Sequence, residues 1–572
     1  MIKKVWDPSR YPAGFAPKYF STKFFMNHDV NLRMERSRGS ESCLFLWIVL
    51  PLFLLIASCA SDESPDSEYS SSTVLDERLT DKELIARRHC AGCPIYPEPD
   101  LLDKNTWLTQ TLPAMGPHLG IFIYDGEEYP LDETEYLPEN FYPDYAVATD
   151  EEWQAILDFY KEMAPERLER DDDLTEIRRE NHIFEPFRPP YRSDTHPMAS
   201  AVKIDPANGL IFLADANLGR MLIYNRNLDI VDTFEVPAAI SHIAFTNNPS
   251  EEGRRGLMIT YIANINPSDA KDGFISRGWY DPDSGRGEFD DRFIENLARP
   301  VEALLADLNQ NGEQDLLVSE FGHREGSVFW LKGEGDGNFN QQKNTLINTP
   351  GCLDSEIVDW TGNGLPDVLV LCSQVDQAIY LFENRGNGEF SRTTLLRFPI
   401  TAGSSSFEVH DFNGNGRLDI LYTSGDNADY SMVYKPYHGV YIYTNDGEGQ
   451  FTESWFYPIN GAYSAKARDF SGDGSLDIAV TSFFADYARK PQEGFIFFKN
   501  SGNLAFTPYH PPEASYGRWI AMDTADWTGN GRDDIVLANF SLGPTKVHEQ
   551  VEAILTQSPH LLVLRNLSAS SN

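Results

Sequence analysis

The feature that most constrains this chain is a nine-residue acidic loop that occurs five times. The clearest copy runs from Asp411 to Asp419, with side-chain oxygens at its first, third, fifth and ninth positions and glycine at its sixth. The first aspartates of successive copies lie 52 to 58 residues apart. A long period of this kind indicates a protein built from repeated structural units.

The arrangement of oxygens is typical of a chain that wraps around a hard cation. Ca²⁺ takes about six to eight oxygen ligands from carboxylates, amides and backbone carbonyls. Glycine at the sixth position permits the positive φ that aims these oxygens inward. The alternative is a polar turn without an ion. The candidate ligands, with the seventh residue offering its backbone carbonyl, are Asp307, Asn309, Asn311, Glu313, Asp315, Asp359, Thr361, Asn363, Leu365, Asp367, Asp411, Asn413, Asn415, Arg417, Asp419, Asp469, Ser471, Asp473, Ser475, Asp477, Asp526, Thr528, Asn530, Arg532 and Asp534.

The loops are not expected to belong to helix–loop–helix calcium sites. The glutamate that such sites need at the twelfth position is absent; in the third copy Tyr422 stands there. Each loop also runs directly into an apolar β-type segment, such as Asp-Val-Leu-Val-Leu at 367–371. We therefore expect each loop to connect two β-strands.

Strand periodicity around the loops predicts the size of the repeated unit. In the third copy, turn residues separate predicted strands at 406–410, 418–423, 439–445 and 451–457. Four strands in about 50 residues make one propeller blade. Two further units, at 199–237 and 240–293, bring the total to seven. The expected fold is mainly β: a seven-bladed β-propeller of four-stranded blades over residues 197–568.

Three details of this propeller are expected from local sequence. The last unit ends at Asn566 after its third strand, so its outer strand should come from 174–187, in the linker 171–196. Cys352 and Cys372 flank the second loop on opposite strands, which favours a disulfide over two buried free thiols. Outer strands should begin at Phe339, Phe390, Phe451 and Phe506.

The repeats resemble FG-GAP/VCBS repeats, the class that includes the integrin α-subunit propeller. The resemblance covers residues 300–566 directly and reaches the two earlier units if they belong to the same ring. It implies that the acidic loops bind Ca²⁺ between the first two strands of a blade.

Residues 81–170 differ in character, with helical spacing at 82–89 and 150–163. Between these segments lie Cys90-Ala-Gly-Cys93-Pro94, a Pro-Glu-Pro element, Trp107 and Leu-Pro-Ala-Met115. The region resembles the cytochrome c domain found ahead of such propellers in some exported bacterial proteins. The resemblance implies haem c on Cys90 and Cys93, with Met115 as a distal ligand.

Pro94 breaks this pattern, because C-x-x-C-H needs its histidine to bind iron. We favour a cytochrome c-like helical domain without haem, its cysteine pair oxidised outside the cytoplasm. Haem bound with His89 in place of the missing ligand remains the alternative, and would make this an electron-transfer protein.

Residues 1–58 are interpreted as a signal peptide or precursor segment. The apolar run 44–56 is too short for a comfortable membrane anchor, and basic residues precede it. Ile-Ala-Ser-Cys59 resembles the bacterial lipobox, which implies lipidation of Cys59. An ordinary signal peptide with an incidental cysteine is the alternative. Residues 59–80 read as an acidic, disordered tether. We expect export and lipid anchoring to a bacterial membrane, the outer one, facing the periplasm or the surface.

The charge and the motifs limit the function. A net charge of −40 disfavours nucleic acid and direct contact with anionic membranes, which leaves the lipid anchor as the membrane contact. The sequence has no nucleophile elbow, zinc-protease motif or phosphate loop. We expect a module that binds a protein or polysaccharide, with a polysaccharide-active enzyme as an alternative. The candidate ligand-binding residues lie in long loops between second and third strands: Tyr430, Tyr434, Tyr437, Phe484 and Tyr487.

Overall fold

The computed structural model describes residues 80–90, 92, 95–131, 141–169, 175–189, 195–246, 253–290, 292–427, 433–542, 552, 555 and 558–568. The predicted precursor segment, Cys59 and nearly all of the tether lie outside these residues. Among the described residues, no helix is long and apolar enough to cross a membrane.

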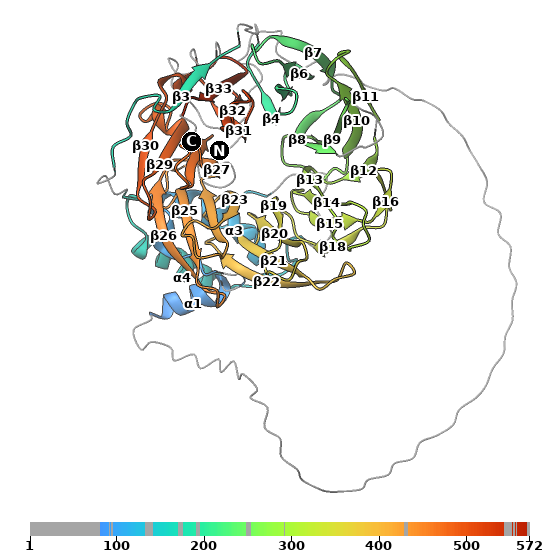
Figure 1. The fold of residues 1–572 in the computed structure, drawn as a ribbon. Coiled ribbons are helices and arrows are strands. Elements are labelled where there is room, and N and C mark those ends of the chain that lie inside the picture. The colour runs from blue at the N-terminus through green and yellow to red at the C-terminus, as the bar shows by residue number, and fades with distance from the viewer. Residues whose placement is uncertain are drawn as a thin grey trace, which may run out of the picture. The chain divides into compact units, whose positions relative to one another are not determined.

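Seven antiparallel sheets follow one another around a ring (Figure 1). They are called blades 1 to 7, and in the first six the chain runs from the strand nearest the centre outward. Blade 1 consists of β4 (Ala199–Asp205), β5 (Leu210–Asp215), β6 (Arg220–Tyr224) and β7 (Ile230–Glu235). Blade 2 consists of β8 (Ala239–Thr246), β9 (Arg255–Ala263), β10 (Gly273–Asp281) and β11 (Arg286–Phe289), with β12 (Ile294–Leu297) beside β10. Blade 3 consists of β13 (Pro300–Ala306), β14 (Asp315–Glu320), β15 (Ser327–Leu331) and β18 (Asn344–Ile347).

The remaining four blades contain the second to fifth acidic loops. Blades 4, 5 and 6 are each continuous in sequence, whereas blade 7 takes its outer strand from an earlier part of the chain. Blade 4 consists of β19 (Cys352–Val358), β20 (Asp367–Cys372), β21 (Ala378–Asn384) and β22 (Phe390–Arg397). Blade 5 consists of β23 (Ser404–His410), β24 (Asp419–Ser424), β25 (Gly439–Asn445) and β26 (Phe451–Pro458). Blade 6 consists of β27 (Ala462–Arg468), β28 (Asp477–Ser482), β29 (Phe495–Asn500) and β30 (Phe506–Tyr509), and blade 7 of β31 (Trp519–Ala525), β32 (Asp534–Asn539), β33 (Leu561–Asn566) and β3 (Phe184–Phe187).

Apolar packing between blades holds the ring together. Every residue is buried in six of the seven second strands, β5, β14, β20, β24, β28 and β32. A hydrophobic cluster is shared by every pair of neighbouring blades, including blades 7 and 1, where Val536 and Leu213 meet. The expected seven-bladed propeller is therefore confirmed.

The seam of the ring lies in blade 7. β3 pairs with β33, so that Phe184 lies opposite Asn566 and Phe187 opposite Val563. Phe184 is buried in the cluster between blades 6 and 7, against Phe470 and Phe497. The predicted donation of the outer strand from 174–187 is confirmed, and it gives β33 a partner on its outer side.

The structure corrects one expectation for blade 3. Phe339 does not begin its outer strand but lies in β17 (Asn338–Phe339), which pairs with β16 (Gly333–Gly335). The outer strand is β18. Gly335, Asp336 and Gly337 all have positive φ, so this segment turns into an additional small hairpin before the outer strand starts. Phe390, Phe451 and Phe506 begin outer strands as expected.

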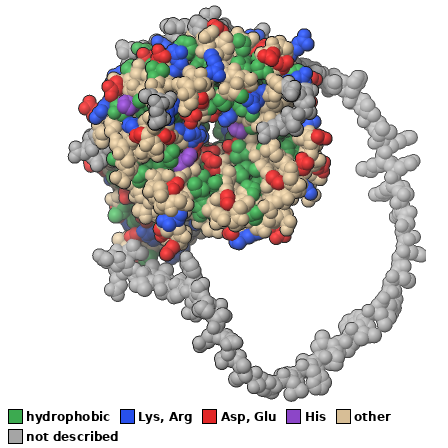
Figure 2. All heavy atoms as spheres, in the orientation of Figure 1, with side chains coloured by type: hydrophobic (Ala, Val, Ile, Leu, Met, Phe, Trp, Pro, Cys, Tyr) green, Lys and Arg blue, Asp and Glu red, His purple; other side chains and the backbone are tan. Residues whose placement is uncertain are grey.

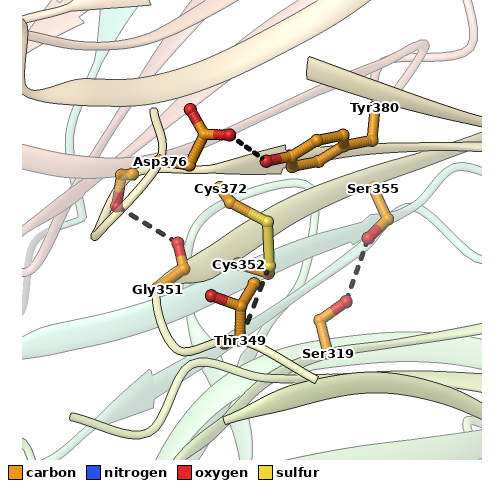
Figure 3. Close-up of a disulfide and its surroundings, with 9 residues drawn as sticks. Ser319, Thr349, Gly351, Cys352, Ser355, Cys372, Asp376 and Tyr380 are labelled. Carbon is orange, nitrogen blue, oxygen red and sulfur yellow. Dashed lines mark hydrogen bonds between the residues drawn. A yellow bond between two sulfur atoms is a disulfide. The ribbon is translucent and has the colours of Figure 1, made fainter. Parts of the chain in front are cut away.

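The predicted disulfide is present, linking Cys352 of β19 to Cys372 of β20 (Figure 3). The two cysteines pair directly across the strands and are fully buried. Beside them, the hydroxyls of Ser319 and Ser355 are 2.9 Å apart and connect blade 3 to blade 4. The bond closes the hairpin that carries the second acidic loop.

Helices precede the ring. The longest, α4, starts with a capping box between Thr149 and Glu152 and buries Trp153, Ile156 and Tyr160. Together with Trp107 these residues form a separate apolar cluster. In chain order, the elements before the ring are α1 (Asp81–Cys90), η2 (Pro99–Leu101), α2 (Lys104–Thr106), η3 (Trp107–Thr111), α3 (Leu112–Met115), η4 (Gly116–Leu119), β1 (Ile123–Tyr124), β2 (Glu127–Glu128) and α4 (Asp150–Met163). The ring itself contains η5 (Pro491–Gly494) and η6 (Pro512–Tyr516).

Candidate metal centres

All five acidic loops occupy the same place in their blades. The first aspartate directly follows the first strand, and the ninth is the first residue of the second strand. In blade 5, for example, His410 at the end of β23 pairs with Asp419 at the start of β24. The loop is thus the tip of the hairpin between first and second strands, as expected.

The first aspartate organises the backbone of its loop. In blade 5, Asp411 accepts hydrogen bonds at Oδ1 from the N–H of Asn415 and at Oδ2 from the N–H of Gly416, at 3.1 and 2.7 Å. In the other four loops the first aspartate accepts the same two hydrogen bonds, from the N–H groups of the fifth and sixth residues, at 2.8 to 3.0 Å. The sixth glycine has φ between +81° and +89° in every loop, which explains why glycine stands there.

The ninth aspartate is a buried anchor. Asp419 accepts from the N–H of Phe412 within the loop and from the N–H of Asn445 at the end of the third strand, at 3.0 and 2.9 Å. All five ninth aspartates are fully buried, and each accepts from a backbone N–H at the end of the third strand or, in blade 3, from Gly333 just beyond it. Burial raises the pKa of four of them: Asp315, Asp419, Asp477 and Asp534.

The donor set fits a hard cation. Every candidate side-chain ligand in the loops is a carboxylate, amide or hydroxyl oxygen. A carboxylate oxygen that accepts one N–H can still bind a further partner. Among the described residues, no three His, Cys, Asp or Glu side chains come together so as to hold a metal ion. A cation here would therefore depend on Asn, Ser, Thr and backbone oxygens as well as on aspartate.

Sequence reasoning missed a residue that connects each loop to the next blade. The second loop residue is apolar and packs in the cluster shared with the following blade. Its signal was visible, because the position holds Leu308, Trp360, Phe412, Phe470 and Trp527. Trp527 also donates from Nε1 to the carbonyl of Gly209 in blade 1, at 3.0 Å.

A second missed feature is a charged cluster on the first strands, near the middle of the ring (Figures 1 and 2). Glu408 of β23 is buried and contacts Lys466 and Arg468 of β27 at 3.0 and 3.2 Å. His410 Nε2 lies 3.1 Å from the same carboxylate. These contacts join blades 5 and 6 by charge as well as by apolar packing.

The carboxyls facing this cluster differ in ionisation. Burial would raise the pKa of Glu408, but Lys466, His410 and Arg468 together hold it well below its ordinary value. On β19, burial raises the pKa of Asp354 to about 6, and burial with the charge of Asp354 raises that of Glu356 to about 7. Such cooperating groups were not recognisable from sequence, because they lie on the first strands of three blades, β19, β23 and β27.

The predicted haem residues are only partly described. Cys90 is the last residue of α1 and Met115 the last of α3, whereas Cys93 and Pro94 lie outside the described residues. Haem binding at Cys90, Cys93 and Met115 therefore stays a prediction.

The predicted ligand-binding aromatics do not form one surface. Tyr434 is 39% exposed, with the Arg489 guanidinium 5.5 Å from its ring centroid. Phe484 and Tyr487 are buried, so their side chains pack within the ring rather than face solvent. Tyr437 donates to the carbonyl of Leu101 in the helical region, at 2.9 Å. Tyr430 lies outside the described residues.

Sequence comparison supports the repeats. Residues 307–370 and 359–422 match the family profile described as the FG-GAP-like repeat. Each match starts at the first aspartate of one loop and ends in the second strand of the next blade. The phosphatidylinositol-glycan-specific phospholipases D of mouse and rat are each 26% identical to this chain over 175 residues, 29% of this chain. The match spans 19% of the length of these relatives.

Solved structures are similar to this chain at a low level. The N-terminal domain of Nup159 has a TM-score of 0.38 at 11% identity, covering 68% of this chain and 97% of that structure. Raptor of Chaetomium thermophilum has a TM-score of 0.42 at 13% identity, covering 74% and 33%. Likeness at this level carries no argument about function.

Proposed function

We propose that the protein is an exported interaction module, anchored by lipid at Cys59, whose propeller is stabilised by Ca²⁺ at its acidic loops. The observation that carries the proposal is the shared hydrogen-bond arrangement of the five loops. In each, the first aspartate, the fifth side chain and the ninth aspartate are held at fixed places around a glycine-containing turn. Ca²⁺ would bind oxygens that the loop already orients.

The position of the loops explains why an ion would matter for the whole ring. The second residue of each loop packs against the following blade, so a loop that loosens also weakens a blade interface. An ion that neutralises the aspartates of one loop would remove their repulsion, which costs a few kcal/mol at about 4–5 Å and an effective dielectric near 20. The proposed role of Ca²⁺ is thus structural.

Export agrees with two features of the chain. The Cys352–Cys372 disulfide belongs to an oxidising compartment, and the lipobox-like residues end at Cys59. The partner is proposed to be a protein or polysaccharide, met through exposed loop residues such as Tyr434 beside Arg489.

Two experiments test the proposal. Metal analysis of the purified protein after gel filtration should find Ca²⁺ bound in several-fold molar excess over protein, and absence of bound metal would overturn the calcium part. Expression in a bacterial host should place the wild type in the membrane fraction and Cys59→Ala in the soluble exported fraction. Equal fractionation of the two would overturn the lipid anchor.

A further inference from the structure

The acidic loop of blade 6 differs from the other four at its fifth position. Asp469, Asp473 and Asp477 give it three carboxylates, whereas the other loops have asparagine at the fifth position. Judged from sequence, it is the most attractive of the five for a divalent cation.

A side chain of the protein itself already reaches these oxygens. Lys499 of β29 extends its ammonium into the loop, where Nζ lies 2.8 Å from Ser471 Oγ and 2.5 Å from Asp473 Oδ2. Nζ also lies 2.6 Å from the carbonyl of Asn500 and 3.4 Å from Asp477 Oδ1. The ammonium thus contacts the side chains of the third, fifth and ninth loop positions, which are the predicted cation ligands.

The electrostatics of the loop agree with this arrangement. Burial alone would lower the pKa of Lys499 and raise the pKa of Asp473. Their hydrogen bond and opposite charges have the reverse effect and prevail, so the pKa of Lys499 is raised and that of Asp473 is lowered. The Lys499 side chain is 18% exposed, so the pair is partly shielded from water. A lysine that is charged at every physiological pH supplies the positive charge here permanently.

The equivalent residues of other blades turn elsewhere. Thr444 in blade 5 lies 2.6 Å from Ser454 of the outer strand, and Arg565 in blade 7 lies 2.6 Å from Glu185 of β3. Glu383 in blade 4 pairs with Arg385 at 2.8 Å. Among these, only Lys499 is directed into its loop by the described contacts.

We infer that blade 6 has an internal cation in place of a metal: the Lys499 ammonium occupies the loop from Asp469 to Asp477, and this loop binds no Ca²⁺. The inference rests on the proposed calcium binding of the other loops, and it predicts four bound ions rather than five. It also predicts that removal of the ammonium creates a site for a divalent cation, because the oxygens of Ser471, Asp473 and Asp477 then lose the positive charge that they share.

The test counts Ca²⁺ bound to the full-length protein by equilibrium dialysis and metal analysis. We expect four ions for the wild type and five for Lys499→Met. Lys332→Met is the matched control, because Lys332 holds the equivalent position in blade 3 and is exposed; it should bind four. An unchanged count in Lys499→Met, or five ions in the wild type, would overturn the inference.

A second pair of variants gives an answer even if Lys499→Met does not fold. Asp469→Ala should leave the count at four, whereas Asp411→Ala in blade 5 should lower it to three. A loss of one ion in Asp469→Ala would overturn the inference. The wild-type count separately tests calcium binding: no ion in the wild type but one in Lys499→Met would reject the proposed calcium sites and keep the lysine inference.

Discussion

Asn566, at the end of blade 7, donates a hydrogen bond from Nδ2 to the backbone carbonyl of Phe470, the second residue of the acidic loop of blade 6, at 2.8 Å. Asn384 in blade 4 has the same relationship to Leu308 in blade 3, at 2.9 Å. Each asparagine also accepts from the following turn, at Ser568 and Gly386 respectively. The order of an acidic loop is therefore coupled to the packing of the next blade.

Replacing Asn384 with alanine should destabilise the protein markedly. Its side chain is fully buried and donates to the carbonyls of both Leu308 and Pro366. The substitution leaves buried backbone groups without partners, at about 1–3 kcal/mol for each group. We expect the free energy of unfolding to fall by about 3 kcal/mol in chemical denaturation.

Asn445→Ala in blade 5 is the control for this prediction. The described hydrogen bonds of the Asn445 side chain, to the Leu418 carbonyl and from the Gly447 N–H, stay within one blade. Asn445 is also less buried than Asn384. If the free energy of unfolding falls as much in Asn445→Ala as in Asn384→Ala, the hydrogen bond between blades contributes no more to stability than one within a blade.

Removing calcium should lower the melting temperature by several degrees, because the aspartates of each loop would then repel one another. Asp411→Ala should reproduce part of this loss and make the protein less responsive to EDTA. Differential scanning calorimetry with EDTA and with excess Ca²⁺ would measure both effects.

Asp446→Ala is a suitable comparison, because Asp446 is an exposed turn aspartate in the same blade that caps the N–H groups of Glu448 and Gln450. It should melt below the wild type by no more than about 1 °C, with the full response to EDTA retained. If EDTA leaves the melting of the wild type unchanged, calcium is not part of its folded state.

Much of the ring was predictable because its signals are local and repeated. Turn residues delimit the strands, the loops mark one hairpin in five blades, and the missing outer strand of blade 7 follows from the short chain after Asn566. Cys352 and Cys372 flank the same loop on its two adjoining strands, where they lie opposite each other. In each case a pattern along the chain determines a pairing across neighbouring strands.

Features that depend on side-chain direction were not predictable. Lys499 and Thr444 hold equivalent positions, yet one enters its loop and the other faces the outer strand. Phe484 and Tyr487 were expected in a recognition loop, but both are buried, and Phe484 packs in a cluster with Phe483 and Phe540. The carboxyls of Asp354 and Glu408 meet only because the closed ring brings different blades together.

A chain that starts at residue 190 should lose the closed ring, because β3 is removed and the outer side of β33 is left without a partner. Exposed strand edges favour pairing between molecules, so we expect aggregates in size-exclusion chromatography with light scattering. The matched chain starting at residue 175 lacks the same helical region but keeps β3, and should be monomeric. Monomeric behaviour of both chains would mean that β3 is dispensable for closure.

Reduction of the disulfide should destabilise blade 4. The bond closes a hairpin over 20 residues, and a cross-link of this size contributes about 2–4 kcal/mol. The wild type with dithiothreitol should therefore unfold at lower denaturant than without it. The double variant Cys352→Ser, Cys372→Ser should unfold at the lower concentration with or without reductant; a reductant effect of full size in this variant would assign it to other cysteines.

Protonation of the first-strand carboxyls should make stability depend on pH. The pKa values of Asp354 and Glu356, about 6 and about 7 in the folded protein, lie above their ordinary values of 3.8 and 4.5. Protons are thus held more tightly in the folded state, so this contribution to stability is complete below about pH 4 and is lost as the pH rises through 6 and 7. Asp354 and Glu408 repel the ionised Glu356, while Lys466 and Arg468 attract it.

Glu356→Gln removes one of these ionisations while keeping the shape of the side chain. We expect its melting temperature to exceed that of the wild type by about 1–3 °C at pH 8 and to match it near pH 4. Glu389→Gln, at an exposed turn outside the cluster, should follow the wild type at both pH values. If Glu356→Gln is less stable than the wild type at pH 8, the ionised Glu356 is stabilised by its basic neighbours, and burial does not dominate its titration.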